Sequence, residues 1–548
     1  MPFIKKKYLI LLCVLSALLL SLSWPLNGFP FLVFISLVPL IIVIEEIKKN
    51  PDRFTALATL RYSYITFLIW NALTTWWIWH STVVGALIAI FVNSLFMSIV
   101  VQIAAFVRGK LENNIIGIAI FPIFWIAFEY LHQLWDLSWS WLNLGNVFAS
   151  YTAWVQWYEY TGIHGGSLWI ILVNILVYFL IKPYLYKQPA TRKNQKTITI
   201  FLVLALIIPA AASLIRYYTY KERHNPVNIV VLQPNLDPYK EEYQLTVEQV
   251  IDRLFSDKPI SLIDTNTNFI IAPESVLQEG LFEDEFAYSK RIKLIKEILK
   301  TYSPQAHFIS GASTFRMLKP YEPKGPSARK YNGYDLYYEA FNTALFFDSM
   351  GVPQTYHKSK LVPGVEQMPF SEIIKPIENL AIDLGGTVGS LGKSAERVVY
   401  KKGKIPVSAI ICYESIYGEF TAEFVKNGAQ LIFIITNDGW WENTPGHKQH
   451  FAYAKLRAVE TRRSIARSAN TGISCFINQR GDVIEKTSYW TRDAIKNELN
   501  ANNEITFYVK HGDYIGKSFT FISILLIFIA ILMFFAKKKT SLKNKISK

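Results

Sequence analysis

The chain has 548 residues, of which 51% are apolar and 15% aromatic, so it is too apolar for an ordinary soluble enzyme and long enough for two or more domains. Its net charge of +15 would suit nucleic-acid binding, but Lys and Arg gather in alternate loops between apolar runs. A nucleic-acid partner is therefore not expected, and the pattern indicates a membrane protein with a soluble part.

About eight apolar runs are long enough to span a membrane, for which roughly 17 to 25 residues are needed. The predicted spans are 8–26, 29–46, 62–80, 82–107, 115–131, 166–185, 197–215 and 518–536. The first run follows three lysines and could instead be a cleaved signal peptide. Because it is long and other spans follow at once, we expect it to be retained.

These spans divide the chain into four parts. We expect the first seven transmembrane helices in residues 1–220, an extracytoplasmic catalytic domain in 226–512, a last transmembrane helix in 516–537 and a basic tail in 538–548. Loops rich in Lys and Arg mark the cytoplasmic side, and here they follow the second, fourth and sixth spans. Both termini are then cytoplasmic, and seven spans before residue 226 place the soluble domain outside.

The outer loop from 132 to 165 lacks Lys and Arg and is rich in tryptophan. Indole rings prefer the headgroup level, so an aromatic belt is one interpretation and an amphipathic ledge beside a lipid substrate is the other. Trp141 is the candidate for such a ledge. Glu129, near the outer end of the fifth predicted span, is a second candidate for substrate contact, although a carboxylate that reaches the interface is the alternative.

Residues 226–512 alternate short β-rich runs with helical patterns, which predicts an α/β layered domain. Three of these runs end in polar residues: "NFIIAPES" at Glu274, "VSAIICYES" at Cys412 and "LIFIITND" at Asn437 and Asp438. Sites in layered sheets usually form at strand ends. These side chains are therefore candidates for one shared site.

Cys412 is the candidate nucleophile. A free cysteine is often only a small buried apolar residue, but this one ends a strand and is followed by Tyr413 and Glu414. A thiol needs a base or a cation nearby to become a thiolate. Glu274 can be the base, and Lys358 in "YHKSKLVPG" can stabilise an oxyanion together with the Tyr413 N–H.

No metal or other cofactor is expected. His447 and His450 have helical spacing, but no third metal ligand stands near them in the sequence. Cys412 and Cys475 could form a disulfide in an oxidising compartment, although a domain of this size does not need one. Lys360 lies so close to Lys358 that sequence alone does not fully separate them.

Taken in order, "PE" after a strand, "YHKSKLVP", "ICYES" and "NDGWW" resemble the nitrilase, or carbon–nitrogen hydrolase, superfamily. With seven spans before this domain and one after it, the whole chain resembles the apolipoprotein N-acyltransferase family. The resemblance implies a four-layer α-β-β-α sandwich beside an α-helical membrane bundle. It also implies that Glu274 is the general base, Lys358 the oxyanion stabiliser and Cys412 the acyl-accepting nucleophile.

The resemblance assigns further residues to the same site. The expected supporting residues are Glu366, Tyr413 and Glu414, and the expected substrate contacts are Trp440, Trp441, Trp141 and Glu129. Around Glu366 the sequence "VPGVEQMP" departs from the usual form of the family, so this residue is aligned less firmly than the other three. The outer-loop segment "SWLNLGN" resembles a family motif near the lipid entrance.

The function implied is phospholipid-dependent N-acylation of the N-terminal diacylglyceryl-cysteine of apolipoproteins, through a thioester, on the periplasmic side of a bacterial inner membrane. A membrane-tethered amidase acting on a small extracytoplasmic substrate is the first alternative, because fold alone does not fix function. A transporter or receptor with an inert enzyme-like domain is the second, and the intact Glu, Lys and Cys argue against it.

Overall fold

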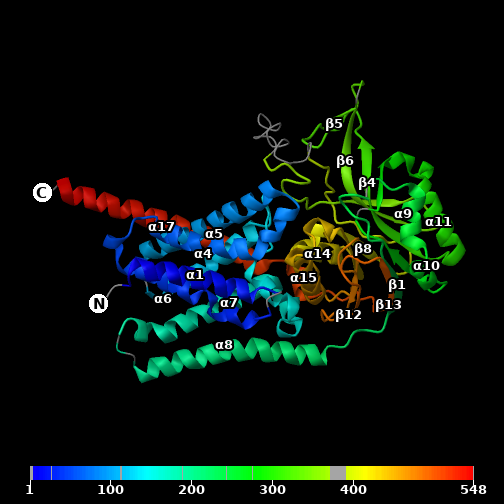
Figure 1. The fold of residues 1–548 in the computed structure, drawn as a ribbon. Helices are drawn as coiled ribbons and strands as arrows, with labels where there is room; N and C mark the ends of the chain where they lie inside the picture. Colours follow the sequence, from blue (N-terminus) through cyan, green and yellow to red (C-terminus); the bar gives the residue numbers. More distant parts are fainter. Residues whose placement is uncertain are drawn as a thin grey trace. The chain divides into compact units, whose positions relative to one another are not determined.

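The computed structural model describes residues 4–25, 28–111, 114–187, 189, 191–241, 244–274, 276–331, 333–370 and 390–546. The chain divides into two compact units (Figure 1). The first unit consists of Met1–Trp76, Gly85–Ile215 and Asp513–Lys548, and the second of Trp77–Val84 and Arg216–Gly512.

Apolar helices make up the first unit. They are α1 (Lys6–Ser23), α2 (Val33–Ser36), α3 (Val38–Lys49), α4 (Ala58–Thr75), α5 (Val83–Leu111), α6 (Asn114–Leu131), α7 (Tyr158–Leu185), α8 (Arg192–Thr219) and α17 (Tyr514–Ile546). Side chains of α1, α3 and α4 share one apolar cluster, and those of α5, α6 and α17 share another. The predicted α-helical bundle is confirmed.

Six segments among the described residues are long and apolar enough to cross a membrane. They are Lys6–Ser23, Pro30–Lys49, Val83–Leu111, Tyr158–Leu185, Arg192–Thr219 and Tyr514–Ala536. The other two predicted spans, 62–80 and 115–131, correspond to α4 and α6. Helix α4 ends at Thr75 and continues as a 3-10 helix, Trp76–His80, so it is shorter than the apolar run that predicted it.

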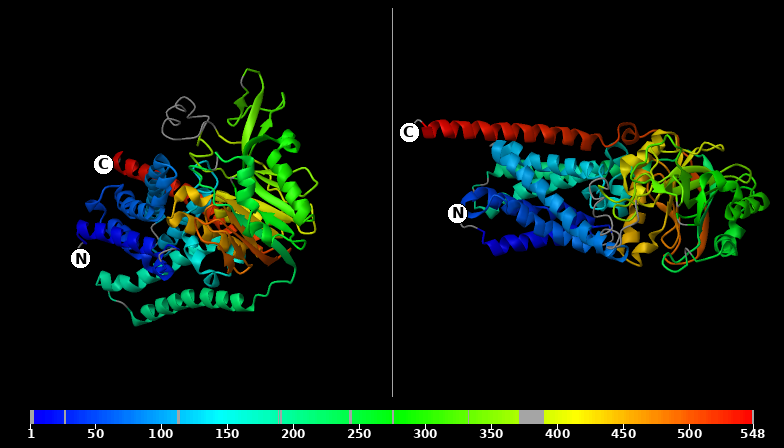
Figure 2. Two further views of the ribbon diagram at one scale, coloured as in Figure 1. Left: turned by 45° about the vertical axis from the view of Figure 1, so that its right-hand side comes forward. Right: turned by 90° about the horizontal axis from the view of Figure 1, so that it is seen from above.

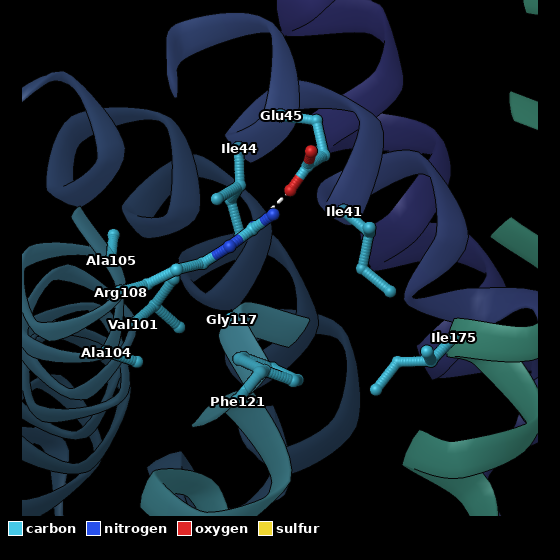
Figure 3. Close-up of a pocket in the computed structure, with 10 residues that line it drawn as sticks. All are labelled: Ile41, Ile44, Glu45, Val101, Ala104, Ala105, Arg108, Gly117, Phe121 and Ile175. Atoms are coloured by element: carbon cyan, nitrogen blue, oxygen red, sulfur yellow. Dashed lines mark hydrogen bonds and ion pairs between the residues drawn. The ribbon is translucent and has the colours of Figure 1, made fainter. Parts of the chain in front are cut away.

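Among the ion pairs of the helical bundle, the one between Arg108 and Glu45 lines a pocket. Arg108 of α5 pairs with Glu45 of α3 at the edge of this pocket (Figure 3). The pocket is lined by Ile41, Ile44, Glu45, Val101, Ala104, Ala105, Arg108, Gly117, Phe121 and Ile175. A charge in such apolar surroundings is costly unless it is paired, and each of these two side chains supplies the partner of the other.

Two β-sheets form the centre of the second unit. The first, with eight strands in the described part of the chain, runs β13-β1-β2-β4-β6-β5, with β3 beside β4 and β7 beside β6. Its strands are β1 (Pro226–Gln233), β2 (Phe269–Ile271), β3 (Leu277–Phe282), β4 (His307–Met317), β5 (Arg329–Lys330), β6 (Tyr337–Phe347), β7 (Gln354–His357) and β13 (Asp493–Asn500). The second, with five described strands, runs β12-β11-β10-β9-β8: β8 (Val407–Ile411), β9 (Leu431–Thr436), β10 (Ile465–Ala469), β11 (Cys475–Ile477) and β12 (Val483–Lys486).

The two sheets pack face to face. Phe269 of β2 meets Phe433 of β9 edge to face at 5.2 Å, and Ser468 of β10 donates to the Leu232 carbonyl of β1 at 2.7 Å. The parallel strands β8, β9 and β10 are buried along their whole length, as expected for strands covered on both faces.

Helices cover the outer faces of the sheets. Helices α9 (Val247–Phe255), α10 (Lys258–Leu262) and α11 (Lys290–Tyr302) pack on the first sheet. Helices α14 (Gly418–Lys426) and α15 (Pro445–Thr461) lie on the side of the second sheet, with α16 (Phe507–His511) against them (Figures 1 and 2). The predicted four-layer α-β-β-α sandwich is therefore confirmed.

Candidate active site

A buried lysine lies between two carboxylates in the second unit. Lys358, which follows β7, places its Nζ 3.0 Å from Glu274 Oε1 and 2.9 Å from Glu366 Oε1, and its side chain is only 1% exposed. Burial alone would lower the pKa of Lys358, but the two carboxylates raise it well above its ordinary value. Lys358 is therefore a permanent cation in this site.

Asn342 of β6 binds the same two carboxylates. Its Nδ2 donates to Glu274 Oε1 at 2.8 Å and to Glu366 Oε1 at 2.9 Å. The other Glu274 oxygen, Oε2, accepts the backbone N–H of Asn437 at the end of β9, at 3.1 Å. The strand ends that the sequence predicted to converge do so, and Glu366 joins them despite the unusual sequence around it.

A glycine in β4 makes room for Glu274. A Cβ added at Gly311 would come within 1.7 Å of the Glu274 carbonyl oxygen, so no other residue fits without moving the backbone of Glu274. This close approach fixes where the Glu274 carboxylate enters the site.

Cys412 lies at the end of β8 in a strained conformation. Its φ of +48° is in the left-handed region, which costs a residue with a Cβ about 1–2 kcal/mol. Burial, and secondarily the Glu274 charge, raise the pKa of the Cys412 thiol, while the Lys358 charge opposes this shift. The resting group is thus a thiol that needs a base to take its proton, and Glu274 and Lys358 are both close enough to act on its charge.

Glu414 ties the end of β8 to the segment that carries Lys358. Its Oε1 accepts the backbone N–H of Ser359 at 2.6 Å and that of Lys360 at 3.2 Å, and the Tyr356 hydroxyl at 2.7 Å. Its Oε2 accepts the N–H of Ile411 at 2.9 Å. Burial raises the pKa of Glu414, and these donors oppose the shift. Its contacts are those of a residue that positions the site.

We expect Glu414→Gln to destabilise the protein by about 2–4 kcal/mol, because the new NH2 group would face N–H donors in a fully buried place. The apparent thermal unfolding midpoint of the detergent-solubilised protein should fall by roughly 5 °C or more. Glu423→Gln, on α14, is the matched control, since its carboxylate is half exposed and pairs with Arg397. Equal midpoints for the two variants would contradict this account of Glu414.

The structure separates the two neighbouring lysines. Lys358 contacts both carboxylates, whereas the Lys360 Nζ lies over the Tyr417 ring, 5.0 Å from its centroid. Burial lowers the pKa of Lys360 to about 8.

Tyr413 is buried and meets Tyr417 edge to face at 5.3 Å. Cys412 and Cys475 are both free thiols, so the disulfide alternative is wrong.

The four candidate substrate contacts lie in different places. Trp440 meets Tyr239 at 5.2 Å, and Trp441 meets Trp77 at 4.9 Å, in each case edge to face within the second unit. In the first unit Trp141 is 2% exposed. Glu129 is also buried, and its Oε1 accepts the N–H of Leu144 at 2.7 Å and Nε1–H of Trp125 at 3.0 Å. For all four, substrate contact stays a prediction.

The sequence did not predict Asn342 as part of the site, and for His450 it indicated a surface or hydrogen-bonding residue rather than a metal ligand. Asn342 belongs to a run that the sequence predicts as a strand. A polar side chain among the mostly apolar residues of that strand is the feature that could have indicated a role in the site. His450 contacts the backbone of Cys412: its Nε2 lies 3.1 Å from the Cys412 carbonyl oxygen. Within the described ranges, no three His, Cys, Asp or Glu side chains are grouped so that they could hold a metal ion.

A thiol at a strained strand end, beside a glutamate–lysine pair on an α-β-β-α sandwich, defines a carbon–nitrogen hydrolase domain. Residues 320–505 match the family described as carbon-nitrogen hydrolase, a range that includes Lys358 and Cys412 and begins after Glu274. Residues 16–176 match the family described as apolipoprotein N-acyltransferase N-terminal domain.

Curated relatives match nearly the full length of the chain. "Apolipoprotein N-acyltransferase" of Chlorobaculum tepidum is 28% identical over 92% of both chains, and that of Geobacter metallireducens is 26% identical over 92% of this chain and 91% of the relative. "Apolipoprotein N-acyltransferase 1" of Treponema denticola is 25% identical over 96% of this chain and 97% of the relative. Among solved structures, an amidase from Nesterenkonia sp. is 13% identical, with a TM-score of 0.32 over 52% of this chain and 93% of that chain. The chain belongs to the apolipoprotein N-acyltransferase family.

Proposed function

We propose that this membrane protein transfers an acyl chain from a phospholipid to the N-terminal amine of a diacylglyceryl apolipoprotein. The observation that carries the proposal is the strained, buried Cys412 thiol beside a lysine held between two carboxylates. This set suits a covalent acyl-enzyme, because it supplies a nucleophile, a base and a fixed positive charge. The full-length relatives named apolipoprotein N-acyltransferase support the choice of substrates.

In the first half-reaction, the Cys412 Sγ attacks the carbonyl carbon of a phospholipid acyl ester and its proton passes to Glu274. The carbonyl electron pair moves onto oxygen, where Lys358 and the Tyr413 N–H stabilise the oxyanion. The tetrahedral intermediate then collapses and the carbon–oxygen bond to the lipid breaks. The leaving oxygen takes the proton from Glu274, which releases a lysophospholipid and leaves a thioester on Cys412.

In the second half-reaction, the α-amino group of the lipoprotein attacks the thioester carbonyl. Glu274 takes a proton from the amine, and the same two donors stabilise the second oxyanion. The carbon–sulfur bond breaks, the amide is released and the Cys412 sulfur regains its proton from Glu274. In the net reaction an acyl group moves from the phospholipid to the amine and a proton moves from the amine to the lysophospholipid. Neither half-reaction therefore needs a cofactor.

The location proposed is a bacterial inner membrane, with both termini in the cytoplasm and the catalytic domain on the periplasmic side. The alternation of basic loops with loops that lack Lys and Arg supports this orientation. In this arrangement residues 1–220 and 516–537 hold the domain of residues 226–512 at the surface from which the phospholipid donor is drawn, and 538–548 form the cytoplasmic tail.

An amidase acting on a small substrate would use the same residues with water as the second acceptor. It is less well supported, because residues 16–176 match the acyltransferase family and not only the hydrolase domain. Cleavage of a small amide would also leave a helical unit of this size without a role.

A two-substrate kinetic study tests the proposal. With a phospholipid donor and a synthetic diacylglyceryl-cysteine peptide, initial rates should follow a ping-pong pattern, with parallel lines in double-reciprocal plots. Lysophospholipid and N-acyl peptide should form in equal amounts. Release of free fatty acid without acylation of the peptide would instead favour the amidase.

A further inference from the structure

Two side chains, those of Ser415 and His450, contact the backbone carbonyl oxygen of Cys412. The Cys412 carbonyl oxygen lies 2.7 Å from the Ser415 hydroxyl, which donates to it, and 3.1 Å from Nε2 of His450. His450 comes from α15, and its Nε2 also lies 2.9 Å from Ser415 Oγ. Because a trans peptide is planar, its C=O and N–H point in opposite directions. Fixing the Cys412 carbonyl therefore fixes the direction of the Tyr413 N–H.

His450 is itself anchored on its other side. Its Nδ1 lies 2.9 Å from Asp438 Oδ1, and Asp438 Oδ2 accepts from Arg467 Nη2 at 2.6 Å. Burial alone would raise the pKa of Asp438, but Arg467 and His450 hold it well below its ordinary range. All three side chains are fully buried. Asp438 is thus ionised, and Arg467 Nη2 also lies 3.1 Å from Nδ1 and can donate to it. These two groups hold the ring with Nε2 facing the Cys412 carbonyl, to which Nε2–H donates.

This support matters because Cys412 adopts a conformation that a residue with a side chain rarely holds unaided. A left-handed residue costs about 1–2 kcal/mol and persists only where surrounding contacts hold the backbone, and the two contacts to the Cys412 carbonyl are part of that support. Without them, rotation of the following peptide would turn the Tyr413 N–H away from the place where the oxyanion forms.

We propose that His450 is a positioning residue of the oxyanion site: through its hydrogen bond to the Cys412 carbonyl, it holds the Tyr413 N–H toward the acyl oxygen. The inference rests on the proposed acyl-enzyme chemistry but not on a particular acyl donor. His450 touches no substrate, and its effect passes through one peptide bond.

Two substitutions separate this role from a general structural one. In His450→Asn the side-chain amide replaces Nδ1 and can still contact Asp438, but it is too short to reach the Cys412 carbonyl. In His450→Gln the amide reaches the place of Nε2 and can still donate to that carbonyl. We expect acylation of Cys412 by p-nitrophenyl butyrate to slow about 100-fold in His450→Asn, and to be within about 10-fold of wild type in His450→Gln, since loss of one oxyanion donor costs about 10²–10³.

Alkylation of Cys412 by iodoacetamide is the parallel measurement. This displacement forms no oxyanion, so its rate should change less than about 3-fold in both variants, whereas a collapsed site would alter acylation and alkylation together. The kcat for the ester should fall and its KM should stay constant. His447→Gln is the matched control: its ring stacks on Tyr489 at 4.0 Å, one turn earlier on α15, and it should keep wild-type acylation.

Ser415→Ala removes the other donor to the same carbonyl and should slow acylation about 10-fold, as expected for partial loss of this support. Wild-type acylation in His450→Asn, equal losses in the Asn and Gln variants, or a parallel loss of alkylation would each overturn the inference. Because p-nitrophenyl butyrate requires no lipid, wild-type protein that accepts this ester but no phospholipid would contradict the proposed function while leaving the His450 test valid.

Discussion

Lys358→Met is expected to slow formation of the acyl-enzyme at least about 10³-fold, because it removes the only charged donor assigned to the oxyanion. It also leaves Glu274 and Glu366 facing each other across Asn342 without the cation that binds them both. Breaking a buried ion pair by removing one partner costs about 3–5 kcal/mol, so a lower unfolding midpoint should accompany the loss. Single-turnover acylation by phospholipid in detergent measures the first effect.

Lys360→Met is the matched control for this substitution. Lys360 lies two residues further along and its side chain packs over Tyr417, whereas Lys358 is the lysine that binds the two carboxylates. Its link to Glu414 uses the backbone N–H, which the substitution keeps. Acylation should stay within about 3-fold of wild type. If Lys360→Met were as inactive as Lys358→Met, the assignment of the oxyanion cation would be wrong.

Glu274→Gln is expected to slow both half-reactions about 10²–10⁴-fold, which is the usual contribution of a general base. Gln has nearly the same size and shape as Glu, and its amide oxygen can still accept from Lys358 or from the Asn437 N–H. The free energy of unfolding should therefore change less than in Lys358→Met. Rapid quenching after mixing with phospholipid measures acylation. Adding the acceptor peptide to preformed acyl-enzyme measures transfer.

Glu366→Gln tests whether the two carboxylates are equivalent. Glu366 also binds Lys358 and Asn342, but its Oε2 accepts the Val362 N–H and holds its own loop. We therefore expect a loss at least 10-fold smaller than in Glu274→Gln, because in the proposed mechanism Glu366 orients the lysine and Glu274 carries the proton. Equal losses would show that the base is shared by the pair or misassigned.

The sequence predicted the strand ends that build this site, because polar residues that interrupt apolar runs are visible without a structure. Glu274 and Cys412 each follow such a run, Lys358 was predicted from the segment "YHKSKLVPG", and the structure brings all three together. Asn342 and His450 were not predicted as parts of it. Asn342 lies inside a strand and His450 on a helix, and only their contacts across the sandwich reveal what they bind.

Apolar runs predicted the membrane helices less evenly. The predicted span 62–80 included Trp76–His80, but most of this 3-10 helix is grouped with the second unit, where Trp77 packs on Trp441. Hydropathy depends only on residue types. It therefore does not distinguish a tryptophan cluster that contacts lipid from one that packs against protein. The limits of such helices are therefore set by contacts that a window along the sequence does not contain.

The central claim, an acyl thioester on Cys412, is tested most directly by the intact mass of the protein after incubation with phospholipid, beside a Cys412→Ala control. We expect a mass increase equal to one fatty acyl group, removed by neutral hydroxylamine and absent from the control, because thioesters are cleaved under conditions that spare amides. Unchanged mass in the wild-type protein, or an increase that the Cys412→Ala variant also shows, would contradict the account.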